Sequence, residues 1–395
     1  MFSTRIPANL LPNRLTFAIT EARTHGRQII NLTQSNPTCA GFEYPRDLLE
    51  QLADPRGLTY APEPLGLMVA RRAVATGYAR RGFDVPAERI VLTATTSDAY
   101  SLVFKLLCEP GDEVLVPRPS YPLFEHLARL DAVHAVPYDL GCDVGWSIDL
   151  DGIERAFSPR TRAVLCVHPN NPTGSFVTPI ELDRLASLCA AHDAAIVADE
   201  VFADYELMPG AANRAARMLE RPDVLVFSLG GLSKSIGLPQ AKLSWIGIGG
   251  PDRAVDEALA RLELACDTYL SVSTPVQLAA AELLDRGRPV REQIQARLAA
   301  NLAHLSAAEL EPAGCRVLEA QGGWYVVVQV PSCESEEDLV LRLLDRDQVL
   351  VHPGYFYDFP REAFLVLSLL APEVEFGEGL SRLLRHCASD IAPRP

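Results

Sequence analysis

The chain has 395 residues, of which 48% are hydrophobic and 22% are charged, and its formal net charge is −15 at pH 7. This length exceeds the roughly 250–300 residues over which one hydrophobic core usually extends, so we expect at least two domains, and the composition excludes general disorder. The negative charge argues against nucleic acid or an anionic membrane as the main partner, because both bind clustered positive surface.

Cysteine spacing and hydropathy bear on the cellular location of the protein and on metal binding. The nine cysteines are scattered, with no C-x-x-C pair, which is typical of reduced thiols in a cytosol and offers no metal site. The first residues lack a continuous apolar stretch followed by a small-residue cleavage site, and no later segment is apolar for long enough to span a bilayer. We therefore expect a cytoplasmic protein without metal ligands.

Between residues 89 and 248, short β-rich runs alternate with helical stretches at 97–107 and 179–192. This alternation predicts an α/β domain in which helices sandwich a mostly parallel sheet. Thr178 is placed to cap the second helix. The strands are expected at residues 90–93, 113–116, 163–167, 195–198, 224–227 and 243–248.

The character of the chain changes after Pro251, and a smaller α+β domain is expected there. A helix at about 11–24 should pack with it, because the chain must reach Asn36 near the crevice before it enters the large domain. The expected helices are 252–266, 275–285, 290–310, 335–345 and 373–387, and the expected strands are 322–330, 349–352 and 364–369. The predicted segments are 1–40 (N-terminal arm and helix, packing with the small domain), 41–270 (large domain) and 271–395 (small C-terminal domain).

Three polar motifs stand at the ends of apolar runs in the predicted large domain. Asn171 lies in a turn of sequence NPTG, Asp199 ends the run AAIVAD, and Lys234 lies in GGLSKSIGLPQAK. They are separated by 28 residues (199 − 171) and by 35 residues (234 − 199). Because parallel strands bring their carboxyl ends to one edge of a sheet, these side chains are expected to meet in one crevice.

These three side chains supply groups that a pyridoxal phosphate site needs. Lys234 can form the Schiff base and later move the Cα proton, Asp199 can pair with the protonated pyridine nitrogen, and Asn171 can donate its amide to the 3′ oxygen of the ring. Each residue has an ordinary alternative: a solvated surface lysine, an N-cap or metal-binding aspartate, and simple turn chemistry. No His or Cys cluster near Asp199 supports the metal.

A phosphate cradle and a ring-stacking residue complete the candidate site. Thr95, Thr96 and Ser97 follow the strand at 90–93, where the start of a helix offers backbone amides and hydroxyls to phosphate. Tyr121, in PRPSYPLF, is placed to stack on the face of the ring. The alternatives are an ordinary capped helix and a core aromatic residue.

Together these motifs resemble the class I/II aminotransferases, which are fold type I pyridoxal phosphate enzymes, from about residue 31 to residue 371. The resemblance implies that Lys234 is the Schiff-base lysine and Asp199 the pyridinium partner. It also implies that Tyr60, in YAPEPLG, reaches the phosphate of a neighbouring subunit, so that the active unit is a homodimer. The cofactor site that it assigns consists of Thr95, Thr96, Ser97, Tyr121, Asn171, Asp199, Phe202, Ser233, Lys234, Lys242 and Tyr60.

The chain departs from the family pattern at three cofactor positions. Phe202 stands where many relatives have a tyrosine that hydrogen-bonds the 3′ oxygen. The absence of that hydrogen bond should raise the pKa of the internal aldimine. Lys242 stands where an arginine is usual, so it can serve phosphate but not bidentately. Gly231 replaces a common phosphate-binding serine.

The substrate end departs further. Val366, in FLVLSLLAP, occupies the position of the arginine that normally holds the substrate α-carboxylate, and a valine cannot replace a bidentate cation. Ser35 stands where a glycine usually lets the backbone approach that carboxylate, and Arg361 is a candidate replacement cation. Further candidates for the substrate pocket, with packing in the small domain as the alternative, are Trp324, His352 and Tyr355.

The first interpretation is an aminotransferase that moves an amino group between an amine or amino acid and a keto acid or aldehyde through an aldimine at Lys234. A pyridoxal phosphate-dependent lyase or decarboxylase on the same scaffold is the alternative, because no local motif decides which Cα bond is broken. A pyridoxal-binding regulator and a dinucleotide-binding protein rank far lower, since the chain has no added DNA-binding domain, no basic patch and no G-x-G-x-x-G motif. The sequence does not identify the donor, the acceptor or the pathway.

Overall fold

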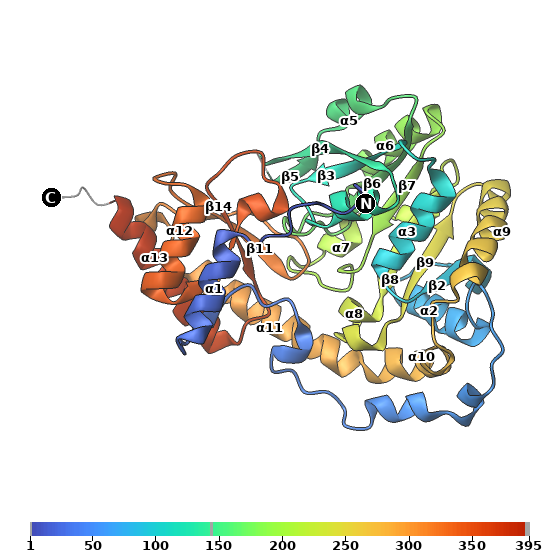
Figure 1. Ribbon diagram of the computed structural model, residues 1–395, viewed down its shortest axis with the longest axis horizontal. Coiled ribbons are helices and arrows are strands. Elements are labelled where there is room, and N and C mark those ends of the chain that lie inside the picture. The colour runs from blue at the N-terminus through green and yellow to red at the C-terminus, as the bar shows by residue number, and fades with distance from the viewer. Residues whose placement is uncertain (1, 143–144, 392–395) are drawn as a thin grey trace.

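A computed structural model describes residues 2–142 and 145–391 of the chain. Figure 1 shows a large part beside a smaller part. The large part holds an eight-stranded sheet, and the smaller part holds a four-stranded sheet and a separate two-stranded sheet. Within the described residues, no helix combines the length and the apolar character that a membrane crossing requires. The predicted fold class, α/β with a smaller α+β part, is confirmed.

The large sheet is mostly parallel. In spatial order its strands are β2 (Ile90–Thr93), β9 (Ser244–Gly249), β8 (Val226–Gly231), β7 (Ala195–Asp199), β6 (Thr161–Val167), β3 (Glu113–Arg118), β4 (His134–Cys142) and β5 (Trp146–Ile148). Strands β8, β7, β6, β3 and β4 run parallel to one another, whereas β9 is antiparallel to both β2 and β8, and β5 is antiparallel to β4. Strands β2, β3, β6, β7 and β8 therefore end at the same edge.

All six predicted strands are present, with ends shifted by up to four residues. Strands β4 and β5 were not predicted. They form one side of the sheet, where β4 is only partly buried and contains Pro137. A partly exposed strand with an internal proline lacks the continuous apolar run that marks the central strands.

Apolar residues cover both faces of the large sheet. In β3, Val114 and Val116 belong to one buried cluster and Leu115 belongs to another, as alternation along a strand requires. Helix α6 begins with the predicted Thr178 cap, which forms a capping box with Glu181. The helices of this part are α2 (Met68–Arg80), α3 (Thr96–Leu107), α4 (Phe124–Leu130), α5 (Leu150–Ala156), α6 (Pro179–Ala191), α7 (Ala211–Arg214), α8 (Leu232–Ser235), α9 (Asp252–Tyr269) and α10 (Thr274–Arg286).

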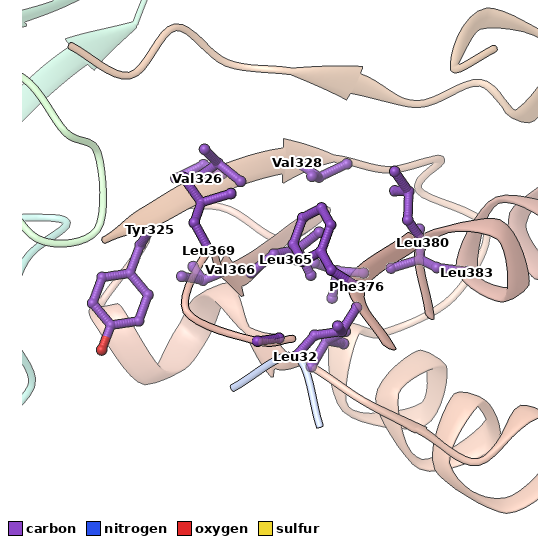
Figure 2. Close-up of a cluster of buried hydrophobic side chains, with 14 of the residues drawn as sticks. Leu32, Tyr325, Val326, Val328, Leu365, Val366, Leu369, Phe376, Leu380 and Leu383 are labelled. Atoms are coloured by element: carbon purple, nitrogen blue, oxygen red, sulfur yellow. The ribbon is translucent and has the colours of Figure 1, made fainter. Parts of the chain in front are cut away.

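The small part joins the two ends of the chain. Its antiparallel sheet has the order β10 (Arg316–Val317), β11 (Tyr325–Gln329), β14 (Phe364–Ser368) and β13 (His352–Pro353), and β1 (Ile30–Asn31) pairs in parallel with β12 (Val349–Leu350). Its helices are α1 (Arg14–Thr24), α11 (Arg288–Ala307), α12 (Glu336–Arg342) and α13 (Glu373–Ile391). Figure 2 shows its aliphatic core, in which Leu32 from the N-terminal segment lies near Phe376 of α13.

Helices α10 and α11 link the two parts. Val276 and Ala280 of α10 pack with Val74 of α2 in the large part, whereas Ile294 and Leu298 of α11 belong to the core of the small part. The predicted segment limits at residues 40 and 270 remain predictions.

Candidate active site

A cavity of about 300 Å³ lies at the carboxyl edge of the large sheet, where the small part faces it. The residues that follow β2, β6, β7 and β8 contribute to its walls, as the spacing of the three motifs predicts. Of the predicted site residues, the cavity is lined by Ser35, Thr96, Ser97, Tyr121, Asn171, Asp199, Phe202, Ser233 and Lys234.

Lys234 lies on the short helix α8, directly after β8. Its Nζ is 5.0 Å from the centroid of the Trp324 ring and 5.6 Å from that of Phe202, and its backbone oxygen accepts a 2.5 Å hydrogen bond from the Tyr205 hydroxyl. Burial lowers the pKa of Lys234, and the charge of Asp199 opposes this only in part. A lower pKa increases the neutral fraction of the amine, which is the nucleophilic form.

Asp199 is the last residue of β7 and is buried. The Tyr100 hydroxyl donates to its Oδ2 at 2.8 Å and the backbone N–H of Val201 donates to its Oδ1 at 3.1 Å. Burial raises the pKa of Asp199 despite these two bonds. A buried carboxylate without an ion-pair partner in the described residues is suited to receive a cationic group.

A turn after β6 presents Asn171 to the cavity. The neighbouring Asn170 holds this turn: its Oδ1 accepts from the Ser120 hydroxyl at 2.8 Å and its Nδ2 donates to Thr173 Oγ1 at 2.9 Å. Gly174 closes the turn at φ +73°, and a Cβ there would lie 2.7 Å from the backbone oxygen of Gly322. Oδ1 of Asn171 is buried without a hydrogen-bond partner among the described residues.

The start of α3 forms the opposite end of the cavity. Thr95 is the helix cap, and its Oγ1 accepts from the Asp98 amide at 3.0 Å. Thr96 and Ser97 line the cavity, and the amides of this first turn have no acceptor within the helix. Thr95 lies behind them and is not among the lining residues.

Besides Thr95, two further predicted cofactor residues lie outside the cavity of one chain. Tyr60 is 79% exposed, and Lys242 is exposed in the left-handed conformation at φ +52°. Their predicted roles remain predictions.

The predicted substrate residues divide into three groups: those that line the cavity, those buried behind its wall and those exposed outside it. Ser35 and His352 line the cavity, whereas Trp324 and Val366 are fully buried behind its wall. Arg361 is exposed and its guanidinium lies 5.2 Å from the Phe364 ring centroid. Tyr355 is also exposed and outside the lining. The structure thus brings no arginine of the described residues to the cavity wall.

Several residues of the site were not predicted from the sequence. Tyr100 follows Ser97 by three residues on one helix, a spacing that places both on the same face and could have identified it. Tyr205, which holds the backbone of Lys234, had no such signal. The other unpredicted residues of the lining include Tyr325, Phe356 and Tyr357 of the small part and Ser244 of β9.

Comparisons with known proteins agree with this geometry. Residues 27–373 match the family described as aminotransferase class I and II. The glutamate-pyruvate aminotransferase AlaA of Escherichia coli K12 is 28% identical over 345 residues, which cover 85% of this chain and 84% of that protein. The alanine aminotransferase of Mycobacterium bovis is 27% identical over 376 residues, covering 91% and 85%.

Solved structures show the same fold. The alanine aminotransferase from Pyrococcus furiosus superposes with a TM-score of 0.86 at 23% identity, covering 98% of this chain and 100% of that one. An aspartate aminotransferase from Thermotoga maritima superposes with a TM-score of 0.80 at 21% identity, covering 97% and 99%. The family match spans most of the chain, and the chain therefore belongs to the class I and II aminotransferases, transferases that use pyridoxal 5′-phosphate.

Proposed function

We propose that Lys234 is the catalytic lysine of this aminotransferase and that Asp199, Asn171, Tyr121 and the first turn of α3 hold its cofactor. The observation that carries the proposal is the position of Lys234: a buried amine with a lowered pKa, in one cavity with the unpaired carboxylate of Asp199.

The residues present fit pyridoxal phosphate. Asn171 offers a buried polar atom without a partner, which suits the 3′ oxygen if the amide is turned to donate. The amides of Thr96 and Ser97 suit a phosphate group. The carboxylate of Asp199, whose burial cost is only partly offset by its two hydrogen bonds, suits the protonated pyridine nitrogen. We infer that Ser233 also contributes to the cofactor site, since it lines the same cavity.

When bound, the cofactor supplies an aldehyde for attachment of amines and an electron sink for the bond broken at Cα. Lys234 would hold the cofactor, and its Nζ would move a proton at the substrate Cα. Asp199 keeps a proton on the pyridine nitrogen, and Tyr100 orients that carboxylate through its 2.8 Å hydrogen bond. Phe202 and Trp324 keep water away from Nζ.

We infer that the active unit is a homodimer. Leu58 and Tyr60 are 91% and 79% exposed, and Tyr60 borders a hollow together with Leu270 at the end of α9. Exposed apolar residues that gather on one surface are typical of an interface. Sedimentation of the purified protein at a mass of one chain would contradict this inference. A cytoplasmic location remains a prediction.

Borohydride reduction of the protein with pyridoxal phosphate, followed by peptide mass analysis, tests the role of Lys234. The chain has three lysines, Lys105, Lys234 and Lys242. We expect the reduced label on Lys234 alone, together with loss of the visible absorption band. A label on Lys105 or Lys242, or no label, would contradict the proposal.

A further inference from the structure

We propose that the substrate end of this cavity takes amino-group donors without an α-carboxylate. These donors are primary amines that carry an uncharged hydroxyl or carbonyl group beside the amino-bearing carbon, held by His352 together with the hydroxyls of Tyr325 and Tyr357. The inference rests on the proposed function, because it names the substrates of the same site.

The described part of the cavity lining offers no free cation to a substrate carboxylate. Among the described residues that line the cavity, Lys234 is the only cationic side chain, and it is committed to the cofactor. Arg361 is exposed beside Phe364, outside the cavity lining. A carboxylate taken from water into such a site loses hydration without gaining an ion pair.

Val366 stands where the family resemblance places the carboxylate-binding arginine. Val366 lies opposite Val327 on one side and His352 on the other, and paired residues of antiparallel strands share a face of the sheet. Tyr325 lies on the same face, two residues from Val327. Figure 2 shows Val366 within the aliphatic cluster, while the Tyr325 hydroxyl points away from it. Valine is too short to pass between these neighbours and reach the cavity.

His352 provides a neutral group in place of that cation. Its ring lies 5.8 Å from Phe356 and 5.9 Å from Tyr357, centroid to centroid, and its Nδ1 is buried without a hydrogen-bond partner among the described residues. Burial lowers the pKa of His352 to about 4, so the ring is neutral at pH 7. A neutral imidazole donates through one nitrogen and accepts through the other, which matches a hydroxyl or a carbonyl group.

Two tyrosine hydroxyls complete this wall. The rings of Tyr325 and Tyr357 lie 6.4 Å apart, and both line the cavity. Burial raises the pKa of each hydroxyl, so both stay protonated and neutral. Ser35 lies close to Tyr325 and adds a third hydroxyl. The wall therefore offers neutral donors and acceptors to the substituent beside the amino group.

The reaction balances as an ordinary amino transfer. The C–N bond of the donor is replaced by a C=O bond whose oxygen comes from water, so the amine becomes an aldehyde or ketone. The nitrogen and one electron pair pass, with the accompanying protons, to the carbonyl acceptor. The donor is oxidised by two electrons and the acceptor is reduced by two.

Affinities of two reduced conjugates test the inference without turnover. N-(5′-phosphopyridoxyl)-L-alaninol and N-(5′-phosphopyridoxyl)-L-alanine differ only in a hydroxymethyl group and a carboxylate. Calorimetry with the full-length apoprotein should show that the alaninol conjugate binds at least about 10-fold more tightly, which corresponds to about 1.4 kcal/mol. Equal affinity, or tighter binding of the alanine conjugate, would overturn the inference.

Binding of pyridoxal phosphate itself separates this result from failure of the proposed function. If the apoprotein binds pyridoxal phosphate and prefers the alanine conjugate, only the substrate inference fails. If it binds neither the cofactor nor a conjugate, the proposed function fails and the substrate inference fails with it.

Variants of the wall locate the contact. We expect His352→Leu to weaken the alaninol conjugate about 10-fold and to leave the affinity for pyridoxal phosphate within about two-fold, since a buried neutral hydrogen bond contributes about 1 kcal/mol and its unpaired partner adds a cost. His352→Gln, which restores a neutral amide, should recover most of the loss. An unchanged affinity in His352→Leu would remove His352 from the site.

Tyr325→Phe and Tyr357→Phe remove only a hydroxyl and should each weaken the alaninol conjugate by a few-fold. Arg361→Ala is the matched control, because it removes a cation outside the cavity lining, and it should change neither affinity. A selective loss of the alanine conjugate in Arg361→Ala would place a carboxylate anchor at Arg361 and overturn the inference.

Discussion

The two ends of the cavity differ in how closely their residues match the family motifs. At the cofactor end, residues of the large part stand where the family motifs predict, and each is fixed by a strand end or a helix start: Asp199 at the end of β7, Lys234 after β8 and Thr96 at the start of α3. At the substrate end, the small part replaces the expected arginine with Val366 and presents His352, Tyr325 and Tyr357. Separate segments of the chain build the two ends, so one end can depart from the family pattern while the other keeps it.

The largest expected effect is at the cofactor end. Lys234→Ala should lower transamination by at least about 10⁴-fold, because it removes both the attachment point and the group that moves the Cα proton. Steady-state rates with a panel of amines and amino acids measure this loss. Lys105→Ala, which removes a surface lysine paired with Asp131, is the matched control and should retain activity. Comparable losses in both variants would mean that the effect does not come from the cavity.

At the substrate end, Glu336 holds the backbone of segments next to the substrate wall. Its buried carboxylate accepts from the backbone N–H groups of Tyr355 and Phe364, both at 2.8 Å. Glu336→Ala leaves these donors unpaired and should lower the free energy of unfolding by about 2–4 kcal/mol. Urea unfolding of the apoprotein measures the change.

The control for Glu336 is its neighbour. Glu337→Ala breaks only the ion pair with Arg14, whose side chain is 62% exposed, and should cost less than about 1 kcal/mol. Similar losses of unfolding free energy in the two variants would show that the backbone hydrogen bonds to Glu336 stabilise the protein no more than an exposed ion pair does.

Val366→Arg tests whether the substrate end can be returned to the family pattern. If the guanidinium passes between Tyr325 and His352, affinity for the phosphopyridoxyl-alanine conjugate should rise about 10- to 100-fold, because charge-assisted hydrogen bonds contribute about 1.5–3 kcal/mol. Calorimetry measures the gain, and Val366→Leu controls for added volume. A folded arginine variant without any gain would contradict the assignment of residue 366 to the substrate wall.

The smallest expected effect concerns Asp199. Tyr100→Phe removes a hydrogen bond that stabilises the ionised carboxylate, so the pKa of Asp199, already raised by burial, should rise further. Affinity for pyridoxal phosphate should fall about 10-fold. Because only the ionised carboxylate pairs with the pyridinium, the loss of affinity on acidification should also set in at a higher pH than in the unsubstituted protein. Titrations of the apoprotein at several pH values measure both changes.

Tyr138→Phe is the control for Tyr100, since it removes a buried hydroxyl that donates to the backbone oxygen of Leu165 at 2.8 Å. It should leave the pH dependence of cofactor binding unchanged. A shift of the same size in Tyr138→Phe would attribute the effect to loss of a buried tyrosine hydroxyl in general. The raised pKa of Asp199 also means that its ionisation opposes folding of the apoprotein as the pH rises through that pKa.

The amino-acid sequence was sufficient to predict the mostly parallel sheet, six of its strands and the meeting of Asn171, Asp199 and Lys234 at one edge. Apolar runs with polar ends carry this information locally, because every parallel strand delivers its last residues to the same side. Strands β4 and β5 left no comparable signal, since their exposed and proline-containing stretches resemble loops.

Which residues form the substrate wall depends on how the small part packs against the large part. His352, Phe356 and Tyr357 reach the cavity because β13 pairs with β14 and the following turn is held by Glu336, and no local pattern shows which face of a short strand meets a second domain. The same holds for Arg361: its distance along the chain from Val366 allowed it to replace the lost cation, but its side chain lies on Phe364, outside the cavity. Sequence separation limits how far a side chain can reach, whereas packing of the two parts decides which way it points.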